Sequence, residues 1–368
     1  MINEQKNVFA QILNYIDLHT PDAVIIAGDI YDRAIPSTEA VEVFDDFLTD
    51  LAGKNIAIII IAGNHDSPER LNFASRLLTN KQIFFCGKFN KQIEKVILQD
   101  KYGSVNFWLL PFIKPSMINV LNTEIETYDD AVKFAIETGE INLAERNVLV
   151  SHQFYTKNGG SLIRSDSELD PVGGLDAVST EIIKDFDYVA LGHLHGSQSS
   201  GEKHINYCGS PLKYSFSEIK QNKSVILVNL DEKTNGVTSI EITKLPLTPI
   251  YDMNEIKGDI YTLLSPEFYE TINAHDYLRV IITNDEEIID PLGKLRNIYP
   301  NIMALDFENS KTSIDINSIS TDEITIKKSS TYELFTEFFL DSQGITLSQK
   351  QEEIVFSILE LLERSDTV

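Results

Sequence analysis

The sequence predicts an α/β protein in which helices cover a sheet. Two apolar runs, in DAVIIAGD (22–29) and NIAIIIIAGNHD (55–66), are typical of strands that are buried on both faces. A segment whose apolar residues have helical spacing precedes each run, at 4–19 and at 37–54, and the second of these begins with capping residues. Helices that alternate with continuously apolar strands are typical of covered, largely parallel sheets.

The chain beyond this first unit adds a second sheet. Between residues 67 and 230 the sequence predicts two further helices and several extended segments, the last of which complete this second sheet. In order, these elements are the helical SPERLNFASRLL (67–78), extended segments between 82 and 112, a helix at 126–139, buried strands at 146–153 and 186–196, and segments 205–218 and 224–230, which complete the second sheet.

A proline-containing segment, KLPLTPIYDM (244–253), marks a domain boundary. Residues 1–245 therefore form the first domain. Residues 246–325 are expected to form a small α+β domain, with a strand in 275–285. The last segment, 326–368, has the apolar spacing of two amphipathic helices.

The composition is that of an ordinary soluble protein, with 42% hydrophobic and 24% charged residues in 368. The N-terminus lacks the features of a signal peptide, and the longest apolar run, 56–62, is far shorter than the roughly 20 residues that span a bilayer. Cys86 and Cys208 are distant in sequence and form neither a disulfide framework nor a paired zinc motif. We therefore expect a cytoplasmic protein.

The acidic charge balance bears on possible partners. With 31 Lys+Arg and 56 Asp+Glu, the formal net charge is −25, which argues against a broad nucleic-acid-binding surface. Carboxylates that bind metals or lie on solvated helix faces give the same balance. Any contact with DNA is expected to be local, assisted by metal ions or shared with a more basic partner.

Polar side chains follow four of the predicted strands at the point where each strand ends. Strand ends of an α/β sheet lie side by side, so these side chains are expected to share one site. Carboxylate, amide and imidazole groups together suit Mn²⁺, Fe²⁺ or Zn²⁺, and two such ions about 3.5–4 Å apart can clamp a phosphate and activate a water. The residues are Asp29, Asn64, His65, His152, His193 and His195.

Each pattern taken alone also has an ordinary structural interpretation. Asp29 suits a strand-end turn, Asn64 to Ser67 suit a helix cap, and His152 suits the edge of a core. Two histidines that flank Leu194 at a strand end are harder to explain by packing. The joint occurrence of these patterns favours a metal site, whereas His19, His204 and His275 lack such a setting and are interpreted as structural.

These residues resemble a known family. GDIYD, GNHD, SH after a strand, and GHLH resemble motifs of the calcineurin-like metallophosphoesterases. Longer stretches resemble the SbcD family of nuclease subunits in bacterial SbcCD complexes, and the resemblance covers nearly the whole chain. They are IIAGDIYDRAIPS, IIAGNHDSPERLNFAS, YVALGHLHGSQ and YCGSPLKYSFSE.

The resemblance implies a fold and a site. The fold is a four-layer α/β/β/α sandwich with a capping domain, 246–325, over a DNA groove. The cofactor is a pair of Mn²⁺ ions, bridged by Asp29. The remaining roles are implied as follows: Asn64, His152 and His193 complete one metal, His195 belongs to the other, His65 is the catalytic histidine, and Asp66 orients its ring.

It also implies partners. The C-terminal helices, 326–368, are expected to dock on the coiled-coil root of an SbcC-like ATPase subunit, and the nuclease subunit is expected to be a homodimer within a heterotetramer. Independently of the resemblance, the Gly/Ser-rich loop 156–174, which follows His152, is expected to meet DNA through Lys157 and Arg164.

One departure from the family concerns the first motif. The family begins with a strand that carries Asp-x-His, and the present sequence begins at the helix that follows it. Asp17-Leu18-His19 has the same spacing but lies at a helix end, so we do not accept it as a replacement. The expectation is that the first strand and two ligands are missing, and that the chain binds about one Mn²⁺ strongly and a second weakly.

The leading hypothesis for function is the nuclease subunit of an ATP-dependent DNA double-strand exonuclease and single-strand endonuclease, acting in recombination, replication and the processing of hairpins or DNA ends. Two alternatives stay open. The chain is a metallophosphoesterase for a phosphoester other than DNA, or a catalytically impaired subunit that binds DNA and SbcC.

Overall fold

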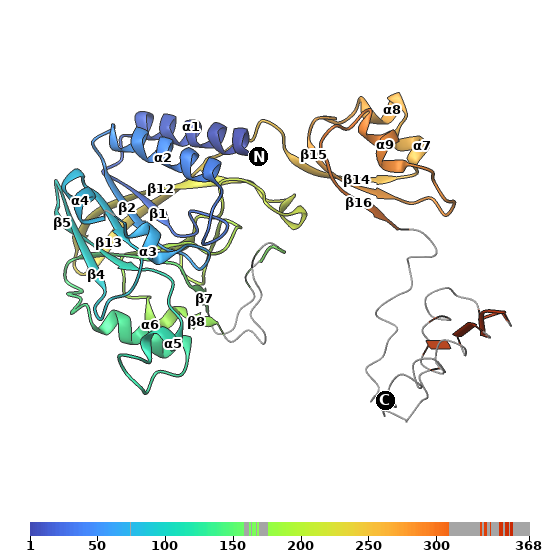
Figure 1. Ribbon diagram of the computed structural model, residues 1–368. Helices are drawn as coiled ribbons and strands as arrows, with labels where there is room; N and C mark the ends of the chain where they lie inside the picture. The colour runs from blue at the N-terminus through green and yellow to red at the C-terminus, as the bar shows by residue number, and fades with distance from the viewer. Residues whose placement is uncertain are drawn as a thin grey trace. The chain divides into compact units, whose positions relative to one another are not determined.

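The computed structural model describes residues 1–73, 75–157, 162, 164–166, 168, 176–308 and scattered positions between 332 and 355. The chain divides into two compact units, Met1–Asn309 and Ser310–Val368, and the first contains every element described below (Figure 1). The helices predicted for 326–368 and most of loop 156–174 lie outside the described residues. In the described part of the chain, no helix has the length and apolarity needed to cross a membrane.

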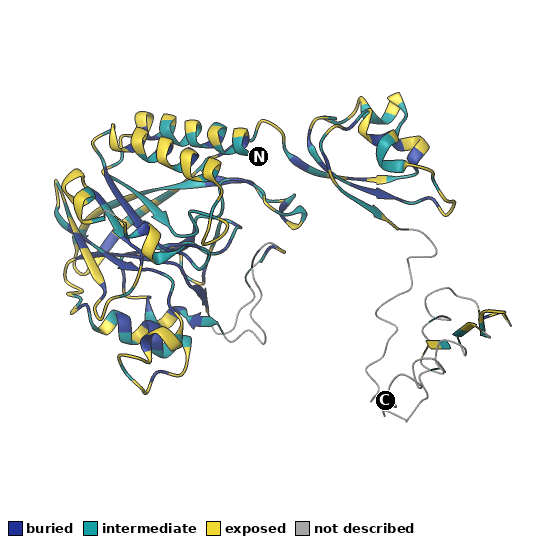
Figure 2. Cartoon of the chain, viewed as in Figure 1, coloured by how far each residue is buried: buried dark blue, intermediate teal, exposed yellow. Residues whose placement is uncertain are grey.

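The first sheet contains three parallel strands in the order β1-β2-β3. Side chains alternate between the faces of a strand, so Ile58 and Ile60 pack against the helices while Ile59 and Ile61 pack against the second sheet. This explains the run of isoleucines, all of which are 0% exposed (Figure 2). The elements are α1 (Ile2–His19), β1 (Ala23–Ala27), α2 (Thr38–Ala52), β2 (Ala57–Ile61) and β3 (Ile83–Cys86).

The second sheet contains six strands in the order β10-β11-β9-β6-β5-β4. Leu109 and Val150 face the first sheet, while Leu110 and Leu149 face a core that α5 (Pro115–Ile118) and α6 (Tyr128–Glu137) complete. The α/β fold class and the α/β/β/α layers are therefore confirmed. The strands are β4 (Glu94–Asp100), β5 (Gly103–Leu110), β6 (Arg146–Ser151), β9 (Tyr188–Leu191), β10 (Gln198–Ser199) and β11 (Ile205–Tyr207).

Two local expectations were wrong. Segment 224–230 does not complete the second sheet, because β12 (Ser224–Thr234) pairs with β13 (Val237–Pro246) in a separate two-stranded sheet. Segment 67–78 forms two short helices, α3 (Pro68–Leu71) and α4 (Ser75–Leu78), in place of one. At the interruption, the Asn72 side-chain oxygen accepts a hydrogen bond from the Gly87 N–H at 3.0 Å.

Short elements complete this part of the chain. Strands β7 (Phe154–Thr156) and β8 (Ala177–Ser179) pair in parallel as a separate sheet. The 3-10 turns are η1 (Thr79–Lys81), η3 (Thr180–Ile182) and η4 (Phe216–Glu218).

Residues 253–307 form a small domain with a hydrophobic core of its own. Its sheet is parallel, in the order β14-β15-β16, and its core includes Leu263, Val280 and Tyr299. The strand β15, the helix α9 within DPLGKLRNIYP (290–300) and the segment of β16, IMALDFE (302–308), were expected from the sequence, whereas β14, α7 and α8 were not separately predicted. The elements are β14 (Met253–Gly258), α7 (Ile260–Leu263), α8 (Pro266–Tyr269), β15 (Tyr277–Ile282), α9 (Pro291–Arg296) and β16 (Ile302–Phe307).

One face of α1 binds the backbone of the segment between the two domains, residues 246–252, which we call the linker. The Gln11 side chain donates to the Thr248 carbonyl oxygen at 2.7 Å and accepts from the Thr248 N–H at 3.0 Å. Asn7 donates to the same carbonyl at 2.9 Å, and the Tyr15 hydroxyl donates to the Pro246 carbonyl at 2.7 Å. Residues three to four apart share one face of a helix, so these side chains form a continuous polar row.

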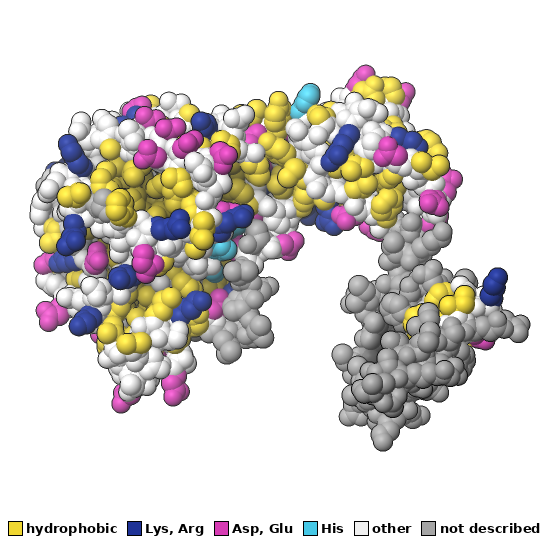
Figure 3. Space-filling view, in the orientation of Figure 1, with side chains coloured by type: hydrophobic (Ala, Val, Ile, Leu, Met, Phe, Trp, Pro, Cys, Tyr) yellow, Lys and Arg dark blue, Asp and Glu magenta, His cyan; other side chains and the backbone are white. Residues whose placement is uncertain are grey.

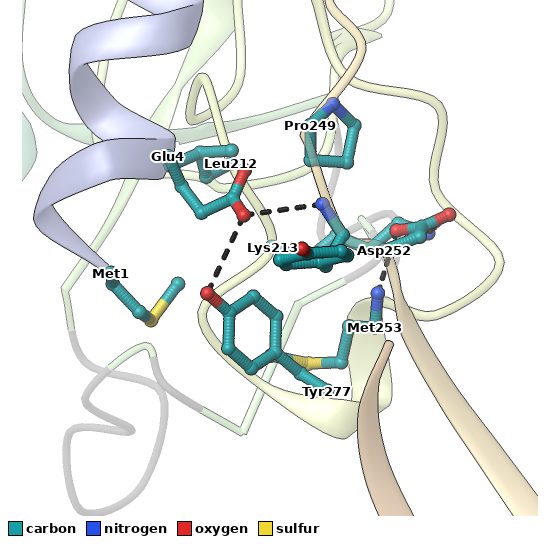
Figure 4. A pocket seen from close by; sticks show the side chains of 9 residues that line it. Met1, Glu4, Leu212, Lys213, Pro249, Asp252, Met253 and Tyr277 are labelled. Atoms are coloured by element: carbon teal, nitrogen blue, oxygen red, sulfur yellow. Dashed lines mark hydrogen bonds and ion pairs between the residues drawn. The ribbon is translucent and has the colours of Figure 1, made fainter. Parts of the chain in front are cut away.

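Glu4 ends this row as a buried carboxylate, only 2% exposed. It accepts hydrogen bonds from the N–H groups of Ile250 at 2.7 Å and Tyr251 at 3.1 Å, and the Tyr277 hydroxyl lies 3.4 Å away (Figure 4). Because Tyr277 belongs to β15, Glu4 connects helix α1, the linker and the small domain at one point.

We expect Glu4→Ala to loosen this joint. The variant leaves two linker N–H groups without their acceptor, which costs about 2 kcal/mol. The expected result is a lower free energy of unfolding and faster proteolysis within residues 246–252. Asn14→Ala, at an exposed position on the same helix, is the control. Proteolysis of the linker at the same rate in both variants would show that Glu4 does not hold the joint.

Candidate metal centre

The carboxyl ends of four strands meet where the two sheets face each other. β1 and β2 are parallel neighbours in the first sheet, and β6 and β9 are parallel neighbours in the second. Asp29 and Asn64 follow β1 and β2, while His152 and His193 follow β6 and β9. The fold thus brings together side chains that are up to 164 positions apart in sequence (193 − 29).

The ligand atoms of these side chains converge. Those of Asp29, His152 and His193 lie within 4.8 Å of one another. His152 Nε2 is 3.0 Å from Asp29 Oδ2 and 3.1 Å from Asn64 Oδ1, and His193 Nδ1 is 2.9 Å from the same Asn64 oxygen. We call Asp29, Asn64, His152 and His193 the four-residue cluster.

The tautomer of His152 makes this cluster suited to a cation. Its Nδ1 lies 2.6 Å from the Ala27 carbonyl oxygen, which can only accept, so Nδ1 carries the proton. In the neutral ring Nε2 then has a lone pair, although its neighbours are the oxygens of Asp29 and Asn64. Lone pairs that face one another repel, and either a proton on Nε2 or a metal ion between these atoms relieves the repulsion. The donor set of imidazole, amide and carboxylate fits a divalent ion.

Backbone conformation brings these groups close together. Asp29 has φ 50° and His193 has φ 95°, which non-glycine residues rarely adopt. A Cβ on Gly63 would collide with Asp29 Oδ1 and with its backbone nitrogen. Glycine at position 63 is therefore what allows the loop after β2 to approach Asp29.

The pKa values reflect burial and mutual charge. Burial favours the neutral form of Asp29, but the charge and hydrogen bond of His152 outweigh it and lower the pKa of Asp29 to about 2. Burial, together with the charge of His152, lowers the pKa of His193 to about 3. Burial also acts to lower the pKa of His152, but Asp29 raises it above the ordinary value. Asp29 is therefore ionised and His193 neutral at physiological pH.

Comparison with known proteins places the chain. Residues 2–197 match the family described as calcineurin-like phosphoesterase. The chain is 32% identical over 367 residues to the SbcD subunit of nuclease SbcCD from Staphylococcus epidermidis, which covers 98% of this chain and 94% of that protein. The chain belongs to the SbcD family of calcineurin-like phosphoesterases. Members of the phosphoesterase family use divalent metal ions.

Other matches extend along the chain. The SbcD subunit of nuclease SbcCD from Staphylococcus saprophyticus is 31% identical over 371 residues, covering 98% of this chain and 94% of that protein. Residues 249–343 match the family described as type 5 capsule protein repressor C-terminal domain. A solved structure of phosphopantetheinyl hydrolase from Mycobacterium tuberculosis aligns with a TM-score of 0.31 and 12% identity over 50% of this chain and 76% of that one, and supports no further argument.

His65 lies beside the cluster in this SbcD-family chain. Its backbone N–H donates to Asp29 Oδ1 at 2.9 Å, and its ring Nδ1 lies 3.0 Å from the Asp32 carbonyl oxygen. The backbone carbonyl of Asp32 therefore orients the His65 ring, whereas the sequence had suggested the side chain of Asp66 for this role. The buried Asp66 carboxylate instead accepts from the N–H groups of Gly63, Ile30 and Tyr31 at 2.9, 3.2 and 3.1 Å. These main-chain hydrogen bonds connect the loop after β1 to the loop after β2, so Asp66 stabilises the conformation of both loops.

His195 has a different setting from the four-residue cluster. Among the described residues, the convergent acidic and histidine group does not include it. Its ring Nδ1 lies 3.0 Å from Oε1 of Glu218, and its N–H donates to Glu168 at 2.6 Å. Neither glutamate was predicted from the sequence. The only available signal was position, since Glu218 closes the family-like stretch YCGSPLKYSFSE and Glu168 lies in the loop before β8.

The two basic residues of the loop after β7 also differ in setting. Lys157 pairs with Glu202 at 2.6 Å on the surface. The Arg164 guanidinium lies 3.6 Å from the centre of the Phe154 ring, and Phe154 is 6.5 Å from the ring of His193. Arg164 therefore lies near His193, and it also pairs with Asp176 at 3.5 Å.

We expect Mn²⁺ affinity to depend on pH through His152. Its raised pKa favours the protonated ring in the metal-free protein, so a bound ion has to displace that proton. Affinity should fall about tenfold per pH unit below the pKa of His152 and level off above it. Mn²⁺ titrations monitored by electron paramagnetic resonance between about pH 5.5 and 8.5 measure this slope.

His204→Ala is the control for this slope, because His204 is a half-buried residue outside the cluster whose ring contacts the Lys184 carbonyl. The same slope is expected in that variant. An affinity independent of pH across the whole range would contradict the assignment of His152 as a ligand.

Proposed function

We propose that this chain is the metal-dependent nuclease subunit of an SbcCD-type complex, an ATP-dependent double-strand exonuclease and single-strand endonuclease. The convergence of the potential ligand atoms of the four-residue cluster is the observation that supports it most strongly. The names of the relatives, which are SbcD subunits of nuclease SbcCD, support the nuclease class. The proposed role includes the processing of DNA ends and hairpins in recombination and replication.

The proposed mechanism assigns one role to each side chain. Asp29, Asn64, His152 and His193 would hold one Mn²⁺, and Asp29 and His195 would contribute to a second. The ions would supply charge for the phosphate and lower the pKa of an attacking water. His65, held by the Asp32 carbonyl, would stabilise charge at the phosphate or protonate the leaving oxygen.

Phosphodiester DNA is the proposed substrate despite the net charge of −25. Lys and Arg side chains are spread among acidic and apolar ones on the face of the molecule shown in Figure 3. Arg164, stacked on Phe154, would add positive charge near the cluster. A comparison of linear duplex DNA with a chromogenic diester separates this proposal from a small-molecule phosphoesterase.

The proposed partners are an SbcC-like ATPase, bound through residues 326–368, and a second copy of this chain. The match of residues 249–343 to a C-terminal domain family supports a dedicated segment after the phosphoesterase domain. Large apolar side chains near α3, α4 and α5 are exposed and offer surface for association: Phe73, Leu77, Met117 and Val120 are 83%, 75%, 52% and 85% exposed.

We expect His65→Ala to lower kcat on duplex DNA by about 100-fold or more while Mn²⁺ affinity stays near the wild-type value. The ring contacts the Asp32 carbonyl and lies outside the four-residue cluster. Rates and Mn²⁺ titrations on the same preparation test this, with His204→Ala as the control. Loss of metal binding together with activity would make His65 a ligand.

Deletion of residues 326–368 is expected to abolish co-purification with the ATPase partner and to leave Mn²⁺ binding unchanged. The cluster and its supporting strands all lie before residue 200. Co-expression of the two proteins, followed by affinity capture and a Mn²⁺ titration, provides both readouts. Full recovery of the complex after the deletion would refute this role.

A further inference from the structure

We propose that Glu218, with Lys223 and Glu168, positions His195 and fixes its tautomer, so that Nε2 carries the lone pair. This proposal rests on the proposed function in one respect, the role of His195 toward a metal. None of these three charged residues belongs to the four-residue cluster. They would be positioning residues, which act on the reaction through His195.

The contacts come from three sides of His195. Glu218 Oε1 lies 3.0 Å from the ring Nδ1, and Glu168 Oε1 accepts from the backbone N–H at 2.6 Å. The Lys223 ammonium donates to the backbone carbonyl oxygen at 2.9 Å. The Tyr214 ring meets the imidazole edge-on, with centroids 6.0 Å apart. The backbone and one ring nitrogen of His195 are therefore fixed independently.

Glu218 is the centre of this arrangement. Its side chain is 0% exposed, and its second oxygen accepts from Lys223 Nζ at 2.6 Å. Lys223 completes its contacts with Ser210 Oγ and Gln221 Oε1, both at 2.8 Å. Because an ammonium has donors only, the carboxylate is held as an acceptor.

Buried charges of this kind are costly, and a well-packed apolar replacement is often at least as stable. Glu218, Lys223 and Glu168 are 0%, 7% and 8% exposed. They come from the turn η4, the segment before β12 and the loop before β8. Three buried charged residues from separate segments surround one histidine. A functional role of His195 explains this arrangement better than packing does.

The tautomer follows from this geometry. Since Glu218 Oε1 accepts, the neutral His195 ring has its proton on Nδ1 and its lone pair on Nε2. A histidine that binds a metal commonly donates its other N–H to a carboxylate, which fixes both tautomer and ring orientation. Glu218 provides this contact, and Lys223 neutralises its charge.

Glu218→Gln tests the proposal because Lys223 determines which end of the new glutamine amide faces His195. The ammonium needs an acceptor, so the amide oxygen faces Lys223 and the NH₂ group faces His195 Nδ1. His195 Nδ1 then has to accept, and the ring proton moves to Nε2. Two-bond ¹H–¹⁵N spectra of metal-free protein labelled at histidine distinguish the two tautomers directly.

The expected results are the Nδ1–H tautomer in the wild type and the Nε2–H tautomer in Glu218→Gln. The variant should cleave duplex DNA about 10- to 100-fold more slowly, with Mn²⁺ still bound by the four-residue cluster. Glu181→Gln is the matched control: Glu181 pairs with Lys184 at 2.7 Å on the surface, and no change is expected at His195.

Should Glu218→Gln not fold, the double variant E218L/K223M removes the acceptor and its counter-charge together. His195 is then expected to show both tautomers. An Nε2–H ring in the wild type, or an unchanged Nδ1–H ring in whichever variant folds, overturns the proposal. A wild-type protein with the expected tautomer but no DNA cleavage would instead refute the proposed function and leave the positioning of His195 intact.

Discussion

The hydrogen bond between His152 Nδ1 and the Ala27 carbonyl oxygen, 2.6 Å long, joins the two sheets at the site. Ala27 is the last residue of β1 in one sheet, and His152 follows β6 in the other. The contact fixes the imidazole tautomer and sets the distance between the sheets at their carboxyl ends. Asp29 and Asn64 can meet His152 Nε2 only when this spacing is kept, so both the geometry and the electrostatics of the cluster depend on it.

Two residues of the four-residue cluster have backbone conformations that are unfavourable for non-glycine residues, and both follow strands of the core. Asp29 and His193 have positive φ angles. The strands before them, the half-buried β1 and the largely buried β9, both contribute side chains to the core between the two sheets. Strain of this kind persists where the surrounding structure over-determines it. The apolar residues of β2 have the same role for the loop after that strand, because their burial on both faces prevents the strand from shifting. Packing of the core thus stabilises Asp29 and His193 in backbone conformations that they would otherwise rarely adopt.

Much of the fold and part of the site could be predicted from the sequence. Apolar periodicity identified the strands, and parallel strands end at a common edge, so residues such as Asp29 and His193 could be expected to meet. What escaped prediction depends on contacts between distant loops. Nothing in the sequence near His195 indicates Glu168 or Lys223 as its neighbours. The role of Asp66 was misjudged because backbone N–H groups, which nearly every residue has, compete with side chains for a carboxylate.

The row of side chains on α1 binds only main-chain atoms of the linker, apart from the Tyr277 hydroxyl at Glu4. At positions 248, 250 and 251 this contact is made by the backbone, so it places few demands on the side chains there. Substitutions at these three positions keep the contact as long as the N–H groups remain, which excludes proline. The side chain of Leu247 is different, because it is buried in a hydrophobic cluster with Val8 of α1. We therefore expect evolution to maintain the polar face of α1 and an apolar residue at position 247, while the backbone contact itself leaves residue identity open at positions 248, 250 and 251.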